Sequence, residues 1–394
     1  MKYKLSEIFE KPISGEWGNE LEEGKYGAKV IRTTNFTNMG RLNLNDIVER
    51  DIDVEKYKNK LLKLGDIIIE KSGGSPNQPV GRVVIFEENT SEKYFCNNFT
   101  SILRPKNIVN AKYSLYLLKD LYNKKRVLKY QNKTTGIINL KLNDYLNNTE
   151  IMIPSIEEQI KISTILDKSQ ELIDKRKEQI EALDELVKSQ FIEMFSEVNE
   201  YVRVSEYIES LTAGKSLAGE SECKNKVLNT GSISYDYFDM NQVKNLPNDY
   251  IPKEEHLVNV GDVLISRMNT SELVGATAYV WNVNPNIYIP DRLWKANFKP
   301  NCNPIFVWQL LIQNSTKEKI RRIASGTSGS MKNISKLGLL GIEVIKVDIE
   351  KQNEFANFVK QVDKLKFEME KSLKELEDNF NSLMQKAFKG ELFN

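Results

Sequence analysis

Groups that commonly carry chemistry are scarce in this sequence, which has three cysteines and one histidine among 394 residues. Cys96, Cys223 and Cys302 stand apart with no CxxC pair, which predicts reduced thiols and no structural zinc site. His256 lies in a polar stretch without other ligand residues, so we expect it at the surface. No run approaches the roughly eighteen apolar residues of a membrane span, and the N-terminus lacks the apolar core of a signal peptide. These absences indicate a cytoplasmic protein that does not enter a membrane.

Two short motifs resemble catalytic sites, but each lacks a part that the chemistry needs. Asp66, Glu70 and Lys71 resemble the acidic–acidic–lysine set of a nuclease. Adjacent residues on a strand point to opposite faces, so Glu70 and Lys71 cannot share one site. Residues 213–216 resemble the end of a phosphate-binding P-loop, but Glu209 stands where the first glycine is required. The sequence also lacks a cofactor-binding glycine fingerprint, a Ser/His/Asp set and a metal cluster, so we expect no catalytic residue, no cofactor and no metal.

Residues 155–195 and 348–388 share one apolar pattern and align without a gap. The apolar residues of the second stretch alternate by four and three, interrupted at Lys366, and Leu172 and Leu186 widen the stripe of the first. Over about five heptads without glycine or proline this spacing is typical of a coiled coil, and about forty residues of helix span roughly 60 Å. Neither helix can bury its stripe alone. We therefore expect the two helices to pair, rather than to serve as ordinary core helices of one globule.

The segments that precede the two helices repeat each other as well. Leu64-Gly-Asp-Ile-Ile in the first half matches Val260-Gly-Asp-Val-Leu in the second, and each reads as a turn followed by a buried strand. We also expect helices over residues 113–130 and from Ile305 onward, and a polar loop at residues 133–136. The chain is therefore predicted to be a tandem duplication of a globular α/β unit followed by a long helix.

The formal net charge of +1 gives no sign of a nucleic-acid partner when it is taken over the whole chain. The charge is uneven, however. The first long stretch holds ten acidic and six basic residues, and the second holds nine and seven, which leaves about +7 on the rest of the chain. That modest excess is compatible with DNA binding by the segments outside the helices.

The residues at the ends of the two long helices carry a family resemblance. Ile153-Pro-Ser-Ile-Glu-Glu-Gln opens the first helix, and Ala387-Phe-Lys-Gly-Glu-Leu-Phe closes the second. Together with the two Gly-Asp segments, these motifs make the whole chain similar to the specificity subunits of Type I restriction–modification systems. The opening of the second helix, Asp348-Ile-Glu-Lys-Gln, departs from the pattern because it lacks the proline and one glutamate of the first.

The resemblance implies a mixed α/β (α+β) fold built as a pseudo-two-fold tandem repeat. Two similar globular target recognition domains, residues 1–153 and 198–347, would be joined by two long helices, residues 154–197 and 348–394, that pair as an antiparallel coiled coil. Each domain would read one half of a bipartite, asymmetric target in double-stranded DNA, with the coiled coil setting the separation. The implied partners are two adenine-methylating modification subunits and the restriction subunits, and the chain itself would have no catalytic role.

Loops rich in Arg, Asn, Ser and Thr can bond to base edges, while basic side chains contact phosphates. On this basis we predict DNA contacts in both halves of the chain. In the first half they are Arg32, Thr33, Asn35, Lys71, Ser72, Lys133 and Thr134; in the second they are Asn229, Thr230, Arg267, Asn269, Arg292, Thr327 and Ser328. Two other interpretations stay open. One is a specificity chain of a two-component or fused nuclease–methylase system outside Type I, and the other is a structural adaptor in which the coiled coil is the functional part.

Overall fold

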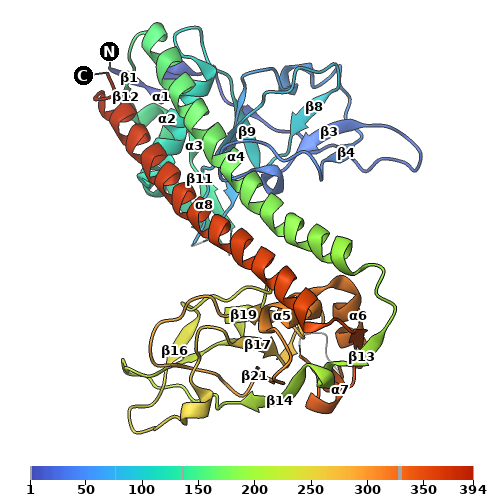
Figure 1. The fold of residues 1–394 in the computed structure, drawn as a ribbon. Helices are drawn as coiled ribbons and strands as arrows, with labels where there is room; N and C mark the ends of the chain where they lie inside the picture. Colours follow the sequence, from blue (N-terminus) through green and yellow to red (C-terminus); the bar gives the residue numbers. More distant parts are fainter. Residues whose placement is uncertain (1, 76, 135–136, 327–330, 394) are drawn as a thin grey trace. The chain divides into compact units, whose positions relative to one another are not determined.

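A computed structural model describes residues 2–75, 77–134, 137–326 and 331–393, without the side chains of residues 133 and 134. The chain divides into two compact units, one formed by Met1–Lys177 with Ser372–Asn394 and the other by Glu178–Lys371. Each unit contains one globular lobe and a part of each long helix (Figure 1). We call residues 2–153 the first lobe and residues 198–347 the second lobe.

The first lobe is built around a four-stranded sheet in the order β2-β9-β5-β7. Beside it lie a three-stranded sheet, β4-β3-β8, a second three-stranded sheet, β10-β11-β6, and the ribbon β1-β12. The strands are β1 (Lys2–Lys4), β2 (Ile13–Ser14), β3 (Ala28–Ile31), β4 (Val48–Arg50), β5 (Ile67–Glu70), β6 (Ser72–Gly73), β7 (Val83–Ile85), β8 (Tyr94–Cys96), β9 (Thr100–Leu103), β10 (Gln131–Thr134), β11 (Ile137–Leu140) and β12 (Glu150–Met152), and the helices are α1 (Leu5–Ile8), α2 (Ala111–Asn123) and α3 (Leu142–Asn148).

The second lobe repeats this arrangement, except that the pair β18-β22 stands where the first lobe has the three-stranded sheet β10-β11-β6. Its central sheet has the order β14-β21-β17-β19, flanked by β16-β15-β20 and by the pairs β18-β22 and β13-β23. The strands are β13 (Tyr201–Arg203), β14 (Ile208–Ala213), β15 (Lys226–Leu228), β16 (Val243–Asn245), β17 (Val263–Ser266), β18 (Met268–Asn269), β19 (Thr277–Tyr279), β20 (Ile287–Tyr288), β21 (Leu293–Phe298), β22 (Lys332–Asn333) and β23 (Glu343–Ile345), and the helices are α5 (Pro304–Ile312), α6 (Asn314–Ile323) and α7 (Lys336–Leu340). The duplication seen in the sequence is therefore a duplication of topology.

The central strand of each lobe is buried on both faces, which explains its unbroken apolar sequence. Successive side chains of a strand point to opposite faces. In β5, Ile67 and Ile69 join the cluster under α1, α2 and α3, while Ile68 joins the cluster beneath β3 and β8. In β17, the alternate residues Val263 and Ile265 likewise belong to one core cluster, and the residue between them belongs to another. Apolar residues on both faces hold each central sheet between two layers.

The repeated Gly-Asp motif shapes the turn that leads into this central strand. Gly65 has φ +88° and Gly261 has φ +96°, a left-handed conformation that favours glycine. The following aspartate closes the turn, because Asp66 accepts a hydrogen bond from the Lys63 N–H at 2.8 Å. Asp66 also forms an ion pair with Arg104 at 2.8 Å. The motif found in the sequence is thus a structural element, not a contact to a ligand.

The long helices α4 (Ile156–Phe195) and α8 (Ile349–Lys389) match the predicted extents within a residue or two. A capping box starts α4: Ser155 Oγ accepts from the Glu158 N–H at 3.3 Å, and the Glu158 carboxylate accepts from the Ser155 N–H at 3.1 Å. Gly390, with φ +78°, follows the last turn of α8 as a typical C-terminal glycine. Both helices run without interruption over their full lengths.

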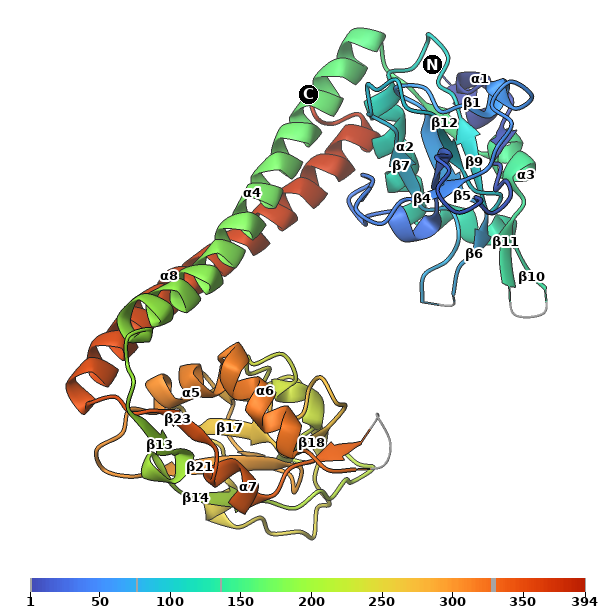
Figure 2. The same cartoon turned by 90° about the vertical axis from the view of Figure 1, so that its right-hand side faces the viewer.

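In the first unit, α4 and α8 lie side by side and run antiparallel (Figure 2). Ile162 and Leu166 share one core cluster with Met384 and Ala387. Farther along α4, Lys177 forms an ion pair with Glu377 at 2.9 Å. Because the partner residue number on α8 falls as the number on α4 rises, the two helices point in opposite directions.

The second unit shows the same antiparallel pairing. Lys366, which interrupts the heptad pattern, forms an ion pair with Asp184 of α4 at 2.6 Å. Toward the lobe, four phenylalanines form an aromatic cluster: Phe191 and Phe195 of α4, Phe306 of α5 and Phe355 of α8, with ring centroids 5.0 to 6.5 Å apart. This aromatic cluster ties the pair of helices to the second lobe.

A buried glutamine fastens the start of each long helix to its own lobe. Gln159 accepts from the Asn110 N–H at 2.8 Å and donates to the Ile108 and Pro154 carbonyls. Gln352, its equivalent in α8, accepts from the Asn303 N–H at 2.9 Å and donates to a carbonyl in the strand-to-helix connection. These bonds satisfy buried backbone groups and fix the angle at which each helix leaves its lobe.

Several expectations drawn from the sequence were wrong. His256 is buried, with 5% of its surface exposed, because the turn that carries it folds against β20 and β21. Of the loop predicted at residues 133–136, residues 133 and 134 belong to strand β10, which pairs with β11, and residues 135 and 136 lie outside the described residues. The helix predicted over residues 113–130 ends at Asn123, and the helix from Ile305 is broken into α5 and α6. Leu172 and Leu186 are 54% and 45% exposed, outside the seam between the helices. In the part of the chain that the structure describes, no helix has the length and apolar character needed to cross a membrane.

Candidate nucleic-acid interface

In the first lobe, a small sheet gathers predicted contact residues from distant segments. Strand β11 lies between β10 and β6, with Lys133 opposite Ile138, and Ser72 opposite Asn139. The Ser72 hydroxyl donates to Asn139 Oδ1 at 2.6 Å. The β10–β11 hairpin projects from the body of this lobe (Figure 2). The side chains of residues 133 and 134 lie outside the described residues, but their backbone is part of this sheet.

Lys71 lies at the base of this sheet, directly after β5. Its ammonium group donates to the Ser14 hydroxyl, and burial lowers the pKa of the Lys71 side chain. Its backbone N–H donates to the Phe99 carbonyl at 2.9 Å, and the Ser72 N–H donates to the same oxygen at 3.2 Å. The connection between β8 and β9 is thereby held against the start of β6.

The third group in the first lobe is a 3-10 turn, Thr33–Asn35. The Asn35 side chain is 2% exposed and holds the loop, because it accepts from the Arg32 N–H at 2.8 Å and donates to the Asn43 and Asp46 carbonyls. Arg32 forms an ion pair with Asp46 at 2.9 Å. Asn35 therefore shapes the loop, and Arg32 is already engaged by a carboxylate.

A buried ion pair connects this turn to the central sheet. Arg82 donates from Nε and Nη2 to the two oxygens of Glu70, at 2.9 and 3.0 Å, and from Nη2 to the Thr33 carbonyl at 3.4 Å. The Glu70 carboxylate raises the pKa of Arg82. A planar guanidinium bound to both carboxylate oxygens has a fixed orientation, so the pair positions the turn next to the end of β5.

The second lobe gathers its predicted residues in the same way. Strands β18 and β22 pair with Asn269 opposite Lys332. The Arg267 guanidinium, directly after β17, donates to Asn333 Oδ1 at 3.4 Å. The Asn269 amide donates to Ser234 Oγ at 3.4 Å, which links this ribbon to the turn that follows Asn229.

Arg292, Asn229 and Thr230 surround one shallow hollow of about 160 Å³, together with Lys244 and Ser216. Asn229 Oδ1 accepts from the Gly231 N–H at 2.9 Å, so this side chain also shapes its own turn. Arg292 is exposed. Two cations beside hydroxyl and amide groups provide the donors that phosphate oxygens or base edges accept. The predicted residues Thr327 and Ser328 lie outside the described residues.

Residues 1–182 match a family model described as the Type I restriction modification DNA specificity domain. The specificity subunit of the Type I restriction enzyme EcoKI from Escherichia coli K12 is 23% identical over 391 residues, which cover 92% of this chain and 82% of that protein. The EcoEI specificity subunit from Escherichia coli is 23% identical over 177 residues, 42% of this chain and 30% of that protein. The chain is therefore similar to the specificity subunits of Type I restriction–modification systems over nearly its whole length.

Solved structures of Type I restriction–modification proteins share the fold of this chain. The S subunit from M. genitalium matches with a TM-score of 0.57 and 16% identity, covering 98% of this chain and 96% of that one. A structure from work on complex assembly and conformational transition of the type I system matches with the same TM-score and 14% identity, over 100% of this chain and 98% of that one. The predicted mixed α/β fold with two similar lobes and two paired long helices is confirmed. The comparisons thus support a DNA-specificity role of the kind for which the matched domain is named.

Reasoning from the sequence missed four residues that lie among the predicted contacts. They are Phe99, Asn139, Lys332 and Asn333. Each reaches the group by strand pairing or by a backbone hydrogen bond from a segment far away in the sequence. The sequence Ile137-Ile-Asn-Leu was a usable signal for Asn139, because a polar residue between two apolar ones is typical of a strand with one polar face.

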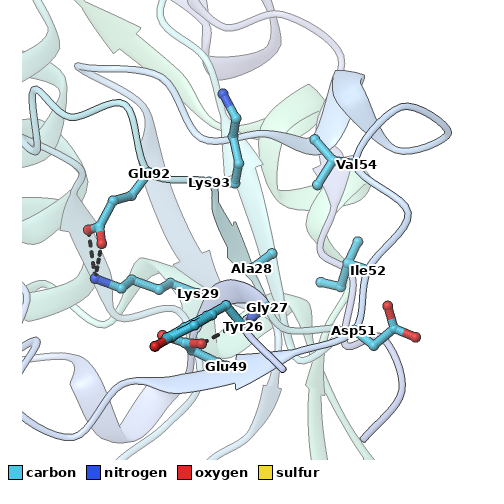
Figure 3. Close-up of a pocket in the computed structure, with 10 residues that line it drawn as sticks. All are labelled: Tyr26, Gly27, Ala28, Lys29, Glu49, Asp51, Ile52, Val54, Glu92 and Lys93. Atoms are coloured by element: carbon cyan, nitrogen blue, oxygen red, sulfur yellow. Dashed lines mark hydrogen bonds and ion pairs between the residues drawn. The ribbon is translucent and has the colours of Figure 1, made fainter. Parts of the chain in front are cut away.

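The first lobe has a larger hollow of about 320 Å³ at the edge of β3 and β4, shown in Figure 3. Its lining mixes both charges: Lys29 forms an ion pair with Glu92 at 2.6 Å, and Glu49 accepts from the Gly27 N–H at 3.1 Å. Tyr26 covers one side. None of the predicted DNA contacts is among its described lining residues. Lys29 is paired with Glu92, and Glu49 and Asp51 add negative charge to the lining, so the hollow offers a polyanion little attraction.

Proposed function

We propose that the two lobes read the two halves of one bipartite, asymmetric target in double-stranded DNA. In this proposal residues 1–153 and 198–347 are the two target recognition domains. Residues 154–197 and 348–394 form the coiled coil that sets the distance between the half-sites. The specificity subunit supplies the recognition, and its partners supply the methylation and cleavage.

The observation that carries the proposal is a shared framework with different side chains at its tips. Both lobes have the same strand order, the same glycine turn and the same pairing of a short strand after the central one. At that short strand the first lobe pairs Ser72 with Asn139 and Gly73 with Ile138, whereas the second pairs Met268 with Asn333 and Asn269 with Lys332. The scaffold that the two lobes share positions the residues, and different donors and acceptors then select different bases.

The proposed contacts divide by chemistry. Asn35 and Arg32 bond to other groups of the first lobe, so these two residues hold the recognition loop. The proposed contacts to DNA are Thr33, Lys71, Ser72, Lys133, Thr134, Asn229, Thr230, Arg267, Asn269, Arg292, Thr327 and Ser328. Charged side chains among them suit phosphates or guanine, and the amides and hydroxyls suit adenine and mixed edges.

The proposed partners are double-stranded DNA, two modification subunits and the restriction subunits, and the proposed location is the cytoplasm. EcoKI and EcoEI, whose specificity subunits resemble this chain, are Type I restriction enzymes. Exposed apolar side chains on the long helices, among them Leu172 and Phe367, support the assembly of further protein on the coiled coil.

A lobe exchange tests the proposal. Residues 198–347 are replaced by the second lobe of another family member, the chimera is expressed with the modification subunits, and methylated motifs are mapped across the genome. The expected result is a new second half-site with an unchanged first half-site and gap. The reciprocal exchange of residues 1–153 is the matched control and should change only the first half-site. Change in both halves, or in neither, would refute independent reading. A purified chain without salt-dependent duplex binding would favour the adaptor interpretation.

A further inference from the structure

The two lobes carry chemically different side chains at one equivalent position of their framework. In the first lobe, the N–H of Lys71, the residue after β5, donates to the Phe99 carbonyl at 2.9 Å. In the second, the N–H of Arg267, the residue after β17, donates to the Arg292 carbonyl at 3.0 Å. Phe99 and Arg292 are thus held by the same backbone bond.

Strand register gives the same equivalence independently. Glu70, the last residue of β5, is opposite Thr100. Ser266, the last residue of β17, is opposite Leu293. The residue that precedes this partner is Phe99 in the first lobe and Arg292 in the second. The two side chains therefore occupy the same place at the start of the strand next to the central one.

Phe99 is an apolar side chain in polar surroundings. It is 46% exposed, although the lobe buries its other phenylalanines at 9, 36, 86 and 95. Its polar neighbours in the chain and across the backbone bonds are the exposed Asn98 and the half-buried Lys71 and Ser72. A single exposed apolar residue is ordinary on a protein surface. Phe99 lies among the proposed DNA contacts, at the position where the second lobe carries an exposed arginine. This placement indicates that Phe99 contacts a group on DNA.

We infer that Phe99 is a specificity-determining residue that contacts the 5-methyl group of a thymine in the half-site read by the first lobe. The inference rests on the proposed function of that lobe. Phenylalanine suits the thymine methyl, the one apolar group on the major-groove edge of a base pair, whereas arginine at the same position suits the two acceptors of guanine. One framework position would then select a T·A pair in one half-site and a G·C pair in the other.

Motif mapping with substituted full-length chains is the first test. Phe99→Ala, expressed with the modification subunits, should lose the preference for T·A at one position of the first half-site and leave the second half-site and the gap unchanged. Phe99→Leu, which stays apolar, should retain part of that preference. Arg292→Ala is the matched variant and should relax one position of the second half-site only. A first half-site without any T·A pair, or a Phe99→Ala motif identical to the unsubstituted one, would overturn the inference.

A second measurement takes its main result from the unsubstituted chain. The unsubstituted chain in complex with its modification subunits binds duplexes in which each thymine of the first half-site is replaced, one at a time, by deoxyuridine, which lacks the methyl group. One replacement should weaken binding by about fourfold, the value expected for one buried methyl group. The same replacement should have no effect on Phe99→Ala.

The outcomes separate the inference from the proposed function. Insensitivity to every deoxyuridine, with base preference retained, would overturn the methyl contact and leave the half-site reading intact. Weaker binding of Phe99→Ala that is uniform across sequences would show a ring inserted between base steps, which also overturns it. If the unsubstituted complex showed no preference at any first-half position, the proposed function of the lobe would fail instead.

Discussion

Lengthening the paired helices gives the sharpest test of the coiled coil as a spacer. The change is a duplication of residues 177–180 in α4 together with a duplication of residues 373–376 in α8. In α4 the duplicated segment starts at Lys177, which pairs with Glu377, and ends before Asp184, which pairs with Lys366. In α8 the duplicated segment lies between Lys366 and Glu377. The apolar residues in them, such as Ile180, are half-buried, so little core packing is disturbed. A four-residue insertion is a stutter that a coiled coil absorbs by local unwinding.

The expected size of the effect follows from helix geometry. Four residues add about 6 Å of length and about 40° of right-handed rotation. One base pair of B-DNA adds about 3.4 Å and, at about ten per turn, roughly 35° in the same sense. The added rotation corresponds to one base pair and the added length to nearly two. We therefore expect the gap between half-sites to grow by one or two base pairs while the bases in each half stay the same.

Mapping methylated motifs in cells that express the lengthened chain with its modification subunits measures this directly. A duplication in α4 alone is the control, and it should weaken methylation because the two helices no longer match in length. Full methylation with an unchanged gap would refute the reasoning, as would an altered half-site. Thermal unfolding of the purified chain excludes loss of structure as the cause of a negative result.

Three further predictions concern stability, each measured by denaturant or thermal unfolding. Gln159→Leu should lower the free energy of unfolding by about 3 kcal/mol, because buried backbone groups lose their partners, and Gln352→Leu should do the same in the second unit. Lys168→Ala, exposed on α4, is the control and should change it by less than about 0.5 kcal/mol. Phe355→Ala, in the aromatic cluster, should cost about 3 to 5 kcal/mol. Burial raises the pKa of Asp363 to about 6, so the folded state binds its proton more tightly than the unfolded state does, and the stability due to this group rises as the pH falls from 7 toward 4. Asp363→Asn should therefore raise stability at pH 8, by about 1 kcal/mol after allowance for solvent screening, and change it little at pH 4.

Each of these predictions has an outcome that contradicts it. Equal effects of the glutamine and lysine substitutions would mean that the glutamines do not fasten the helices to the lobes. A Phe355→Ala loss below about 1 kcal/mol would mean that the cluster refills the space. A stabilisation by Asp363→Asn that is larger at pH 4 than at pH 8 would show that the aspartate is favoured in its charged form.

Local patterns in the sequence determined a large part of this architecture. The heptad spacing predicted both α4 and α8 nearly to the residue, because an apolar stripe on a long helix depends only on residues three and four apart. The Gly-Asp motifs marked the entry to both central strands, since a left-handed turn needs glycine and a short acidic cap at adjacent positions. The duplication followed from the order of these signals.

The composition of the candidate interface was decided by the tertiary structure. Ser72 meets Asn139, and Asn269 lies opposite Lys332, through strand pairings between segments more than sixty residues apart. Asn35 was predicted as a DNA contact, yet it is buried in its own loop. His256 was expected at the surface and is also buried. Burial of a polar side chain depends on which distant backbone groups come within hydrogen-bonding distance, and no local pattern records that. The exposed place of Phe99, equivalent to that of Arg292, became visible only when the backbone bonds of the two lobes could be compared.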